Sequence, residues 1–270
     1  MPPTQLLDAY CSRIGYGGPL EPTFDTLCAM HERHAQTIPF ENIDVLLGQG
    51  VSLDPDTITR KLLQERRGGY CFEHNGLLFD VLRALGFEVA PMLARVRWLV
   101  PPGTQTPQTH MALRVVIDGR PWLADAGFGG IGLMHPLALD TEGEQHTRYE
   151  PRRLVRHGRN LLQQILIGDA WSDVYLLYPD EAYPVDFEVA NWFTSRHPSS
   201  RFRHNLMVAR ADGERRLTLW NREFTVRHVD GSANKRTVHD PAELLVLLEM
   251  EFGLSLPAGV RLECAGLVWD

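Results

Sequence analysis

The chain has 270 residues, a formal net charge of −7 and 44% hydrophobic residues. This length exceeds that of a usual single domain and allows a large buried core, so two or three subdomains are expected. The acidic balance argues against a nucleic-acid-binding protein, because such proteins usually carry a basic surface.

Residues 1–86 are predicted to form a helical domain. Thr4 and Thr23 are placed to cap two short amphipathic helices, and Asp54-Pro55 combines an N-cap with a proline at the first helical position. The helix that follows Asp54 should end at the glycine pair Gly68-Gly69.

Two histidines, His31 and His34, stand close together in the second of these helices. Their segment lacks the spacing and the third ligand of a zinc site. We therefore expect an exposed helix face there and no metal.

The segment from Arg67 to Asn75 brings a cysteine to the start of another helix. The apolar face of that helix is marked by Leu77, Leu78, Val81, Leu82 and Leu85, and Gly86 ends it. Without Cβ atoms, Gly68 and Gly69 can take positive φ and leave the backbone open to a substrate. A cysteine reacts as its thiolate, which the N-terminus of a helix favours, so Cys71 is a candidate nucleophile. The simpler interpretation is a packing cysteine.

Residues 87–183 change to a pattern of strands separated by Pro, Gly and Asp turns. The expected strands are 89–100, 110–117, 121–125, 154–157, 161–167 and 174–178. This number of antiparallel strands suggests a closed barrel or a sandwich.

The turn Asp118-Gly119 fixes the register of one hairpin, because a two-residue loop places Ile117 opposite Arg120. In that register His110 and Asp125 share a face as diagonal neighbours, about 7 to 8 Å apart at the backbone. An aspartate can span that gap and hold the imidazole in one tautomer, which leaves its other nitrogen for a thiol.

Cys71, His110 and Asp125 thus form a candidate set of nucleophile, base and orienting acid. Two alternatives stay open. His110 and Asp125 could serve a strand end and a turn far from Cys71, or His74, three residues after Cys71 on the same helix face, could be the base.

Residues 184–270 are predicted to form a third, α/β part. A short helix after Pro184 leads to strands between residues 206 and 229, and Asp240-Pro241 starts a closing helix rich in leucine.

Four segments of the sequence resemble the arylamine N-acetyltransferases, bacterial type. They are Pro39-Phe40-Glu41-Asn42, Arg67-Gly68-Gly69-Tyr70-Cys71, Thr109-His110 and Asp125-Ala126-Gly127-Phe128-Gly129, in the family's order and approximate spacing. The resemblance implies an α+β fold with an N-terminal helical bundle (1–86), a central antiparallel β-barrel (87–183) and a C-terminal α/β lid (184–270). It also implies a triad like that of cysteine proteases and transglutaminases, formed by Cys71, His110 and Asp125.

The resemblance further implies acetyl-CoA as co-substrate and an arylamine, hydrazine or N-hydroxyarylamine as acceptor, with ping-pong transfer through a cysteine thioester, as in xenobiotic metabolism. Phe40 and Phe128 could supply an aromatic lining and Gly129 part of the pocket wall, although ordinary core packing explains the two rings nearly as well. In the family the arginine at position 67 ties the catalytic loop to the segment that contains Glu41 and Asn42, so we expect Arg67 to be buried and paired with Glu41.

The alternative function is a Cys–His–Asp amide synthase or hydrolase acting on another thioester or amide, and a non-enzymatic binding module is a third possibility. No signal-like stretch follows Met1, no apolar run approaches a membrane span, and the four cysteines lack a framework spacing. We therefore expect a cytoplasmic enzyme without a membrane or nucleic-acid partner.

Overall fold

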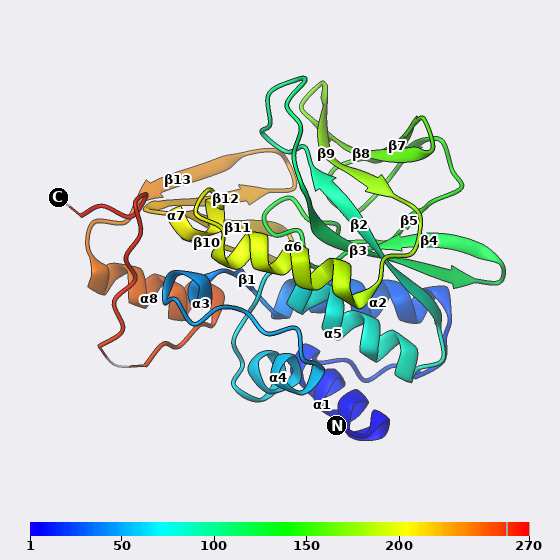
Figure 1. Cartoon of the computed structure of the whole chain (residues 1–270), viewed down its shortest axis with the longest axis horizontal. Coiled ribbons are helices and arrows are strands. Elements are labelled where there is room, and N and C mark those ends of the chain that lie inside the picture. The colour runs from blue at the N-terminus through cyan, green and yellow to red at the C-terminus, as the bar shows by residue number, and fades with distance from the viewer. Residues whose placement is uncertain (258, 270) are drawn as a thin grey trace.

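The computed structural model describes residues 1–257 and 259–269 and places the helices of the first part beneath a curled β-sheet (Figure 1). The helices of this part are α1 (Pro3–Ile14), α2 (Phe24–Thr37), α3 (Ile43–Leu46), α4 (Pro55–Thr59) with its π-helical continuation η1 (Arg60–Gln64), and α5 (Cys71–Ala84).

Two of the three helix caps predicted in the first part of the chain are present. Thr23 accepts a hydrogen bond from the amide of Thr26 (3.2 Å) and Asp54 accepts one from the amide of Thr57 (2.8 Å), so both predicted caps are confirmed. Thr4 is not a cap, because α1 already begins at Pro3. A proline suits that position since the first helical residue needs no N–H partner.

An antiparallel sheet of eight strands forms the middle of the chain, in the order β5-β4-β3-β2-β9-β8-β7-β6. Its strands are β2 (Glu88–Val96), β3 (Gln108–Ile117), β4 (Arg120–Ala124), β5 (Leu137–Ala138), β6 (Gly143–Gln145), β7 (Arg152–His157), β8 (Asn160–Ile167) and β9 (Ala170–Tyr178). The side chain of Gln145 in one edge strand bonds both backbone groups of Ala138 in the other (2.8 and 3.0 Å). The sheet therefore forms the nearly closed barrel that was predicted.

The β3–β4 hairpin has the predicted register. Ile117 pairs with Arg120 and Leu113 with Ala124. Asp118 and Gly119 both have positive φ (52° and 76°), as a two-residue turn of type I′ requires.

The last part of the chain contains α6 (Pro184–Arg196), α7 (Arg201–His204), a second sheet and α8 (Pro241–Phe252), which Asp240 caps. The strands of this sheet are β10 (Met207–Asp212), β11 (Arg215–Trp220), β12 (Glu223–His228) and β13 (Ala233–Thr237). Its edge is β1 (Phe40–Glu41), a strand from the first part of the chain that pairs with β10.

Three groups of buried side chains make up the core. One joins the first helices, one fills the barrel and one lies between α8 and the second sheet. Phe187 and Ala190 of α6 belong to the first group, so this helix packs on the N-terminal core. The division at residues 86 and 183 stays a proposal, and residues 258 and 270 of its third part lie outside the described residues.

Candidate active site

Cys71 is the first residue of α5 and only 4% of it is exposed. Its thiol donates a hydrogen bond to the carbonyl of Thr109 (3.6 Å), the residue before His110 in β3. The start of α5 and the start of β3 therefore meet at the sulfur.

The glycine pair before Cys71 serves close packing, and the expectation of positive φ was wrong: neither residue has the left-handed conformation. A Cβ on Gly68 would lie 2.0 Å from the carbonyl oxygen of Pro39, and one on Gly69 would lie 2.6 Å from the carboxylate of Glu73. In the space that the missing side chains leave, the amide of Glu41 donates to the carbonyl of Gly69 (2.7 Å).

His110 and Asp125 are in direct contact, with 2.7 Å between Nε2 of the ring and Oδ2 of the carboxylate. Both side chains are almost completely buried. The other carboxylate oxygen accepts from the Asn75 side chain (2.9 Å) and from the amide of Gly127 (3.0 Å). Because Nε2 faces Asp125, Nδ1 is left for the thiol of Cys71.

The electrostatics of this group favour a protonated ring. Burial alone lowers the pKa of His110, but the Asp125 charge and hydrogen bonds with Asp125 and Cys71 outweigh it and raise this pKa to about 10. Burial raises the pKa of Asp125, but His110 and the hydrogen bonds from Asn75 and Gly127 bring it below the usual value. The arrangement can hold an imidazolium beside a carboxylate and a sulfur.

The alternative base, His74, uses both ring nitrogens elsewhere. Nδ1 faces Nε2 of His34 (2.9 Å) and Nε2 lies 3.1 Å from the carbonyl of Pro39. Burial lowers the pKa of His74 to about 4. This histidine therefore belongs to a buried structural chain that also includes the hydroxyl of Tyr10, bound to His34.

The expectation of an exposed face at His31 and His34 was wrong, because both residues are fully buried. Nε2 of His31 accepts the amide of Asp125 (2.9 Å), so this side chain orients the backbone of the candidate acid. The two residues are 94 positions apart, so no local pattern in the sequence indicates this contact. Among residues 1–257 and 259–269, no three or more possible ligands gather around a metal position.

Asn75 was also missed, although it follows Cys71 by four residues and so shares its helix face. Its amide nitrogen binds the carbonyl of Met111 (2.7 Å) as well as Asp125, and its oxygen accepts from the amide of Ala126 (3.0 Å). Asn75 thereby ties the nucleophile helix to both strands of the hairpin.

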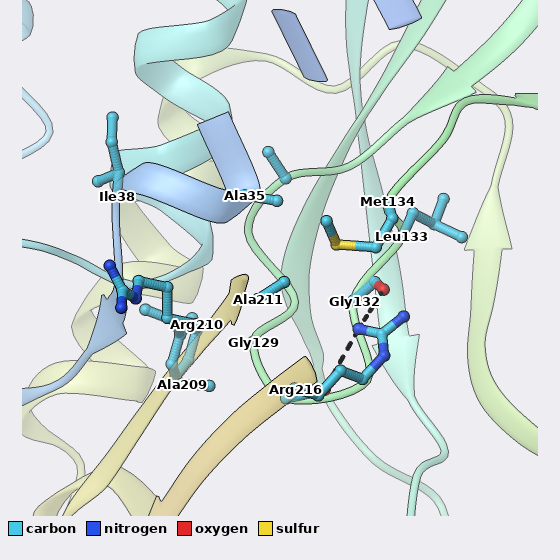
Figure 2. A pocket seen from close by; sticks show the side chains of 13 residues that line it. Ala35, Ile38, Gly129, Gly132, Leu133, Met134, Ala209, Arg210, Ala211 and Arg216 are labelled. Atoms are coloured by element: carbon cyan, nitrogen blue, oxygen red, sulfur yellow. Dashed lines mark hydrogen bonds between the residues drawn. The ribbon is translucent and has the colours of Figure 1, made fainter. Parts of the chain in front are cut away.

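The rings of the two aromatic candidates contact different histidines. The ring of Phe128 meets His110 edge-on at 5.1 Å, whereas Phe40 lies over His74 at 6.4 Å. Gly129 has a φ of 88°, and a Cβ there would lie 3.1 Å from the Phe40 ring. Phe40 lines a small cavity of about 20 Å³. Gly129 and Arg216 also line it (Figure 2).

Two arginines hold the backbone of the loop that follows Asp125. Arg216 of β11 donates to the carbonyl of Gly132 (3.0 Å), as Figure 2 shows, and Arg152 of β7 donates to that of Ile131 (2.7 Å). Arg216 also pairs with Glu150 through two hydrogen bonds (2.9 and 2.8 Å). The loop beside His110 is thus fixed from both sheets.

Arg67 makes the predicted contact with Glu41, through Nε (3.1 Å) and Nη2 (2.7 Å). Its side chain is 16% exposed, and it also binds Asp44 (2.8 Å), which sequence reasoning missed. Asn42 does not join this cluster. Its side chain bonds the carbonyls of Phe202 (2.7 Å) and Asn205 (2.8 Å) and so connects β1 to the last part of the chain.

Comparison with known proteins agrees with this site. The sequence matches the N-acetyltransferase family over residues 23–260. It is 39% identical to an arylamine N-acetyltransferase of Mycobacterium tuberculosis (strain ATCC 25618 / H37Rv) over 93% of this chain and 89% of that protein. The chain belongs to the arylamine N-acetyltransferase family.

Two further members of the arylamine N-acetyltransferase family bear on the chemistry. The arylamine N-acetyltransferase / N-hydroxyarylamine O-acetyltransferase of Salmonella typhimurium (strain LT2) is 38% identical, over 94% of this chain and 90% of that protein. The structure of the Mycobacterium marinum arylamine N-acetyltransferase superposes with a TM-score of 0.89 at 39% identity, over 92% of each chain. Its complex with CoA gives 0.88 at 38% identity, again over 92% of each.

These matches confirm the α+β fold, and the chain is an acetyltransferase enzyme. In the part of the chain that the structure describes, no helix combines the length and apolar character needed to cross a membrane.

Proposed function

We propose that this N-acetyltransferase carries the acetyl group of acetyl-CoA to the nitrogen of an arylamine or hydrazine, or to an N-hydroxyarylamine, through a thioester on Cys71. The observation that carries the proposal is the contact of a helix-start cysteine with a buried His110–Asp125 pair. The relatives named arylamine N-acetyltransferase and the CoA complex support this choice of substrates.

In the first half-reaction the sulfur of Cys71 attacks the thioester carbonyl. The amides of Glu73 and His74 donate to the carbonyl of Tyr70, which leaves the amides of Cys71 and Phe72 as candidate donors to the oxyanion. The C–S bond to CoA then breaks, and the protonated His110 supplies the proton to the departing thiolate.

In the second half-reaction the amine nitrogen attacks the carbonyl of the acetyl-cysteine, and His110, now neutral, accepts the proton of the amine. The C–S bond to Cys71 then breaks, which releases the amide product and restores the cysteine thiolate. Asp125 stabilises the imidazolium that forms again. Aryl amines and hydrazides suit this step because their nitrogens are unprotonated at neutral pH, whereas alkyl amines are mostly ammonium. Phe40, Phe128 and Gly129 are the proposed lining for the acceptor, and a dry aromatic wall would exclude water as the competing nucleophile.

Arg67, Glu41 and Asn42 are proposed as structural support for the loop that carries Cys71. All four cysteines are free, and the net charge of the chain is −7, whereas nucleic-acid binders usually carry a basic surface. We accordingly place the protein in the cytoplasm, without a membrane or nucleic-acid partner.

Intact mass after mixing with acetyl-CoA in the absence of an acceptor tests the reaction type. One acetyl group per chain, absent in Cys71→Ala and retained in Cys28→Ala, is the expected result, and an arylamine should then remove it. Acetylation of another cysteine would contradict the assignment. Rapid release of acetate without any acceptor would favour a hydrolase instead.

A further inference from the structure

A groove lies on the face of the barrel that points away from the interior, and residues 103–106 of the loop that follows β2 line it. Its volume is about 510 Å³, within the range of small-molecule sites. Its floor contains Arg95 of β2, Leu176 of β9 and Leu162 of β8, which are consecutive register partners.

This face is distinct from the one beside Cys71. Successive residues of a strand point to opposite faces. Ala94, the neighbour of Arg95, is buried and pairs with His110, and its other register partner is the buried Leu177. The groove and the candidate active site therefore use opposite sides of the same strands.

Two arginines line the groove. Arg95 donates to the hydroxyl of Tyr178 (2.8 Å) and to the carbonyl of Thr106, and Arg97 donates to the carbonyl of Thr104. Within the described residues neither forms an ion pair, although the chain as a whole is acidic. Asp173 is the single carboxylate among the described lining residues, and it accepts from Gln164 (2.6 Å).

Tyr178 and the two arginines keep O–H and N–H groups that can donate to a ligand. Tyr178 uses its oxygen to accept from Arg95, so its own O–H is left to donate, and the two guanidinium groups keep further N–H groups. His157 also lines the space. Donors of this kind, two of them on permanent cations, match the oxygens of a carboxylate or a phosphate.

The apolar part of the lining indicates which kind of group the anion is attached to. Leu162, Leu176 and the ring of Tyr178, over which Arg95 lies at 5.5 Å, offer contact to a flat or aliphatic group. We propose that this groove binds a small organic anion, a carboxylate or phosphate monoester attached to an aromatic or aliphatic group, whose charged oxygens Arg95 and Arg97 receive. This binding does not depend on the function proposed for Cys71.

Fluorescence titration with 2-naphthoate, 2-naphthyl phosphate and neutral 2-naphthol tests the site on the full chain. We expect saturable binding of one anion per chain, at least about tenfold tighter than naphthol. The double variant Arg95→Gln, Arg97→Gln should weaken it at least about tenfold and leave arylamine turnover unchanged. Arg156→Gln is the matched control, since this arginine is exposed on the neighbouring β7 and pairs with Glu142. The tighter of the two anions identifies the ligand's charged group.

Three results would overturn the proposal: equal affinity for anion and naphthol, equal affinity of parent and double variant, or loss of binding after iodoacetamide treatment of Cys71, which would place the ligand in the active site. If the double variant fails to fold, the single Arg97→Gln decides, because its lost hydrogen bond reaches only the exposed Thr104.

Discussion

Replacing Arg67 by Gln removes the cation from a buried cluster behind the nucleophile. Arg67 makes two hydrogen bonds to Glu41 and one to Asp44. The side chain of Glu41 has no exposed surface, and its remaining hydrogen bond comes from the amide of Ile43 (2.6 Å). The variant therefore leaves a carboxylate that cannot be solvated.

Breaking a buried ion pair from one side costs about 3 to 5 kcal/mol. Lys61, which binds Asp44 and Glu73 (both 2.7 Å), still offers positive charge nearby, so we expect the lower figure, about 3 kcal/mol. At an unfolding entropy of about 2.1 cal/mol/K per residue, a chain of 270 residues should lose about 5 °C in Tm.

Differential scanning calorimetry measures this loss in Tm for Arg67→Gln, with Arg66→Gln as the control. The side chain of Arg66 is exposed, and the residue accepts a hydrogen bond from Arg13 through its backbone carbonyl. The control should therefore have the same melting temperature as the parent protein. Arg67 and Lys61 also lower the pKa of Asp44, although burial works against them. A carboxyl group whose pKa is lowered by folding stabilises the folded state at a pH above its unfolded pKa, and this contribution decreases as the pH falls. The difference in stability between the parent protein and Arg67→Gln should therefore shrink in acid. Equal melting temperatures of the two variants at neutral pH would refute the reasoning.

Three further expectations follow from the site. Cys71, held beside protonated His110, should be alkylated by iodoacetamide at about pH 5.5 before the other three cysteines, as peptide mass mapping would show. Asp125→Asn should lower turnover about 10³- to 10⁴-fold while the chain still folds. Asp125→Asn should also lose a pH dependence of Tm that the parent protein has. The pKa of His110 rises from 6.5 to about 10 on folding, so the protonated ring stabilises the folded state below pH 6.5, and this stability is lost as the pH rises towards 10. Gly68→Ala should lower stability by at least about 3 kcal/mol, because its Cβ would lie 2.0 Å from a backbone carbonyl. Gly76→Ala, inside α5, should change stability by no more than about 1 kcal/mol, because its Cβ would lie 3.5 Å from the side chain of Ile58.

Uniform labelling of the four cysteines would contradict the thiolate–imidazolium pair. Full turnover in Asp125→Asn, or the same pH dependence of Tm as in the parent, would remove the carboxylate from its proposed role. Urea unfolding of the two glycine variants with equal midpoints would show that the loop tolerates a side chain at position 68.

Sequence reasoning succeeded where the physical cause is local. The Asp118-Gly119 turn fixes its own φ values, and a two-residue loop leaves a single register for the hairpin, so the approach of His110 to Asp125 could be predicted. Thr23 and Asp54 cap helices through amides only three residues away.

The failures concern partners that are distant in the chain. Nothing near His31 indicates that it will meet the amide of Asp125, and the space against Gly68 is filled by Pro39, which belongs to another segment. Strand β13 (Ala233–Thr237) was not predicted because all five of its side chains are exposed, which removes the alternation by which strands are recognised.

Strands β1 and β10 leave the ribosome at different times. Phe40 and Glu41 are synthesised early, but their partners Ala209 and Val208 belong to the last third of the chain. Glu41 also bonds Gly69, so β1 is shared between the loop before Cys71 and the C-terminal sheet. During synthesis β1 therefore stands without the partner strand on its other edge until β10 has been made.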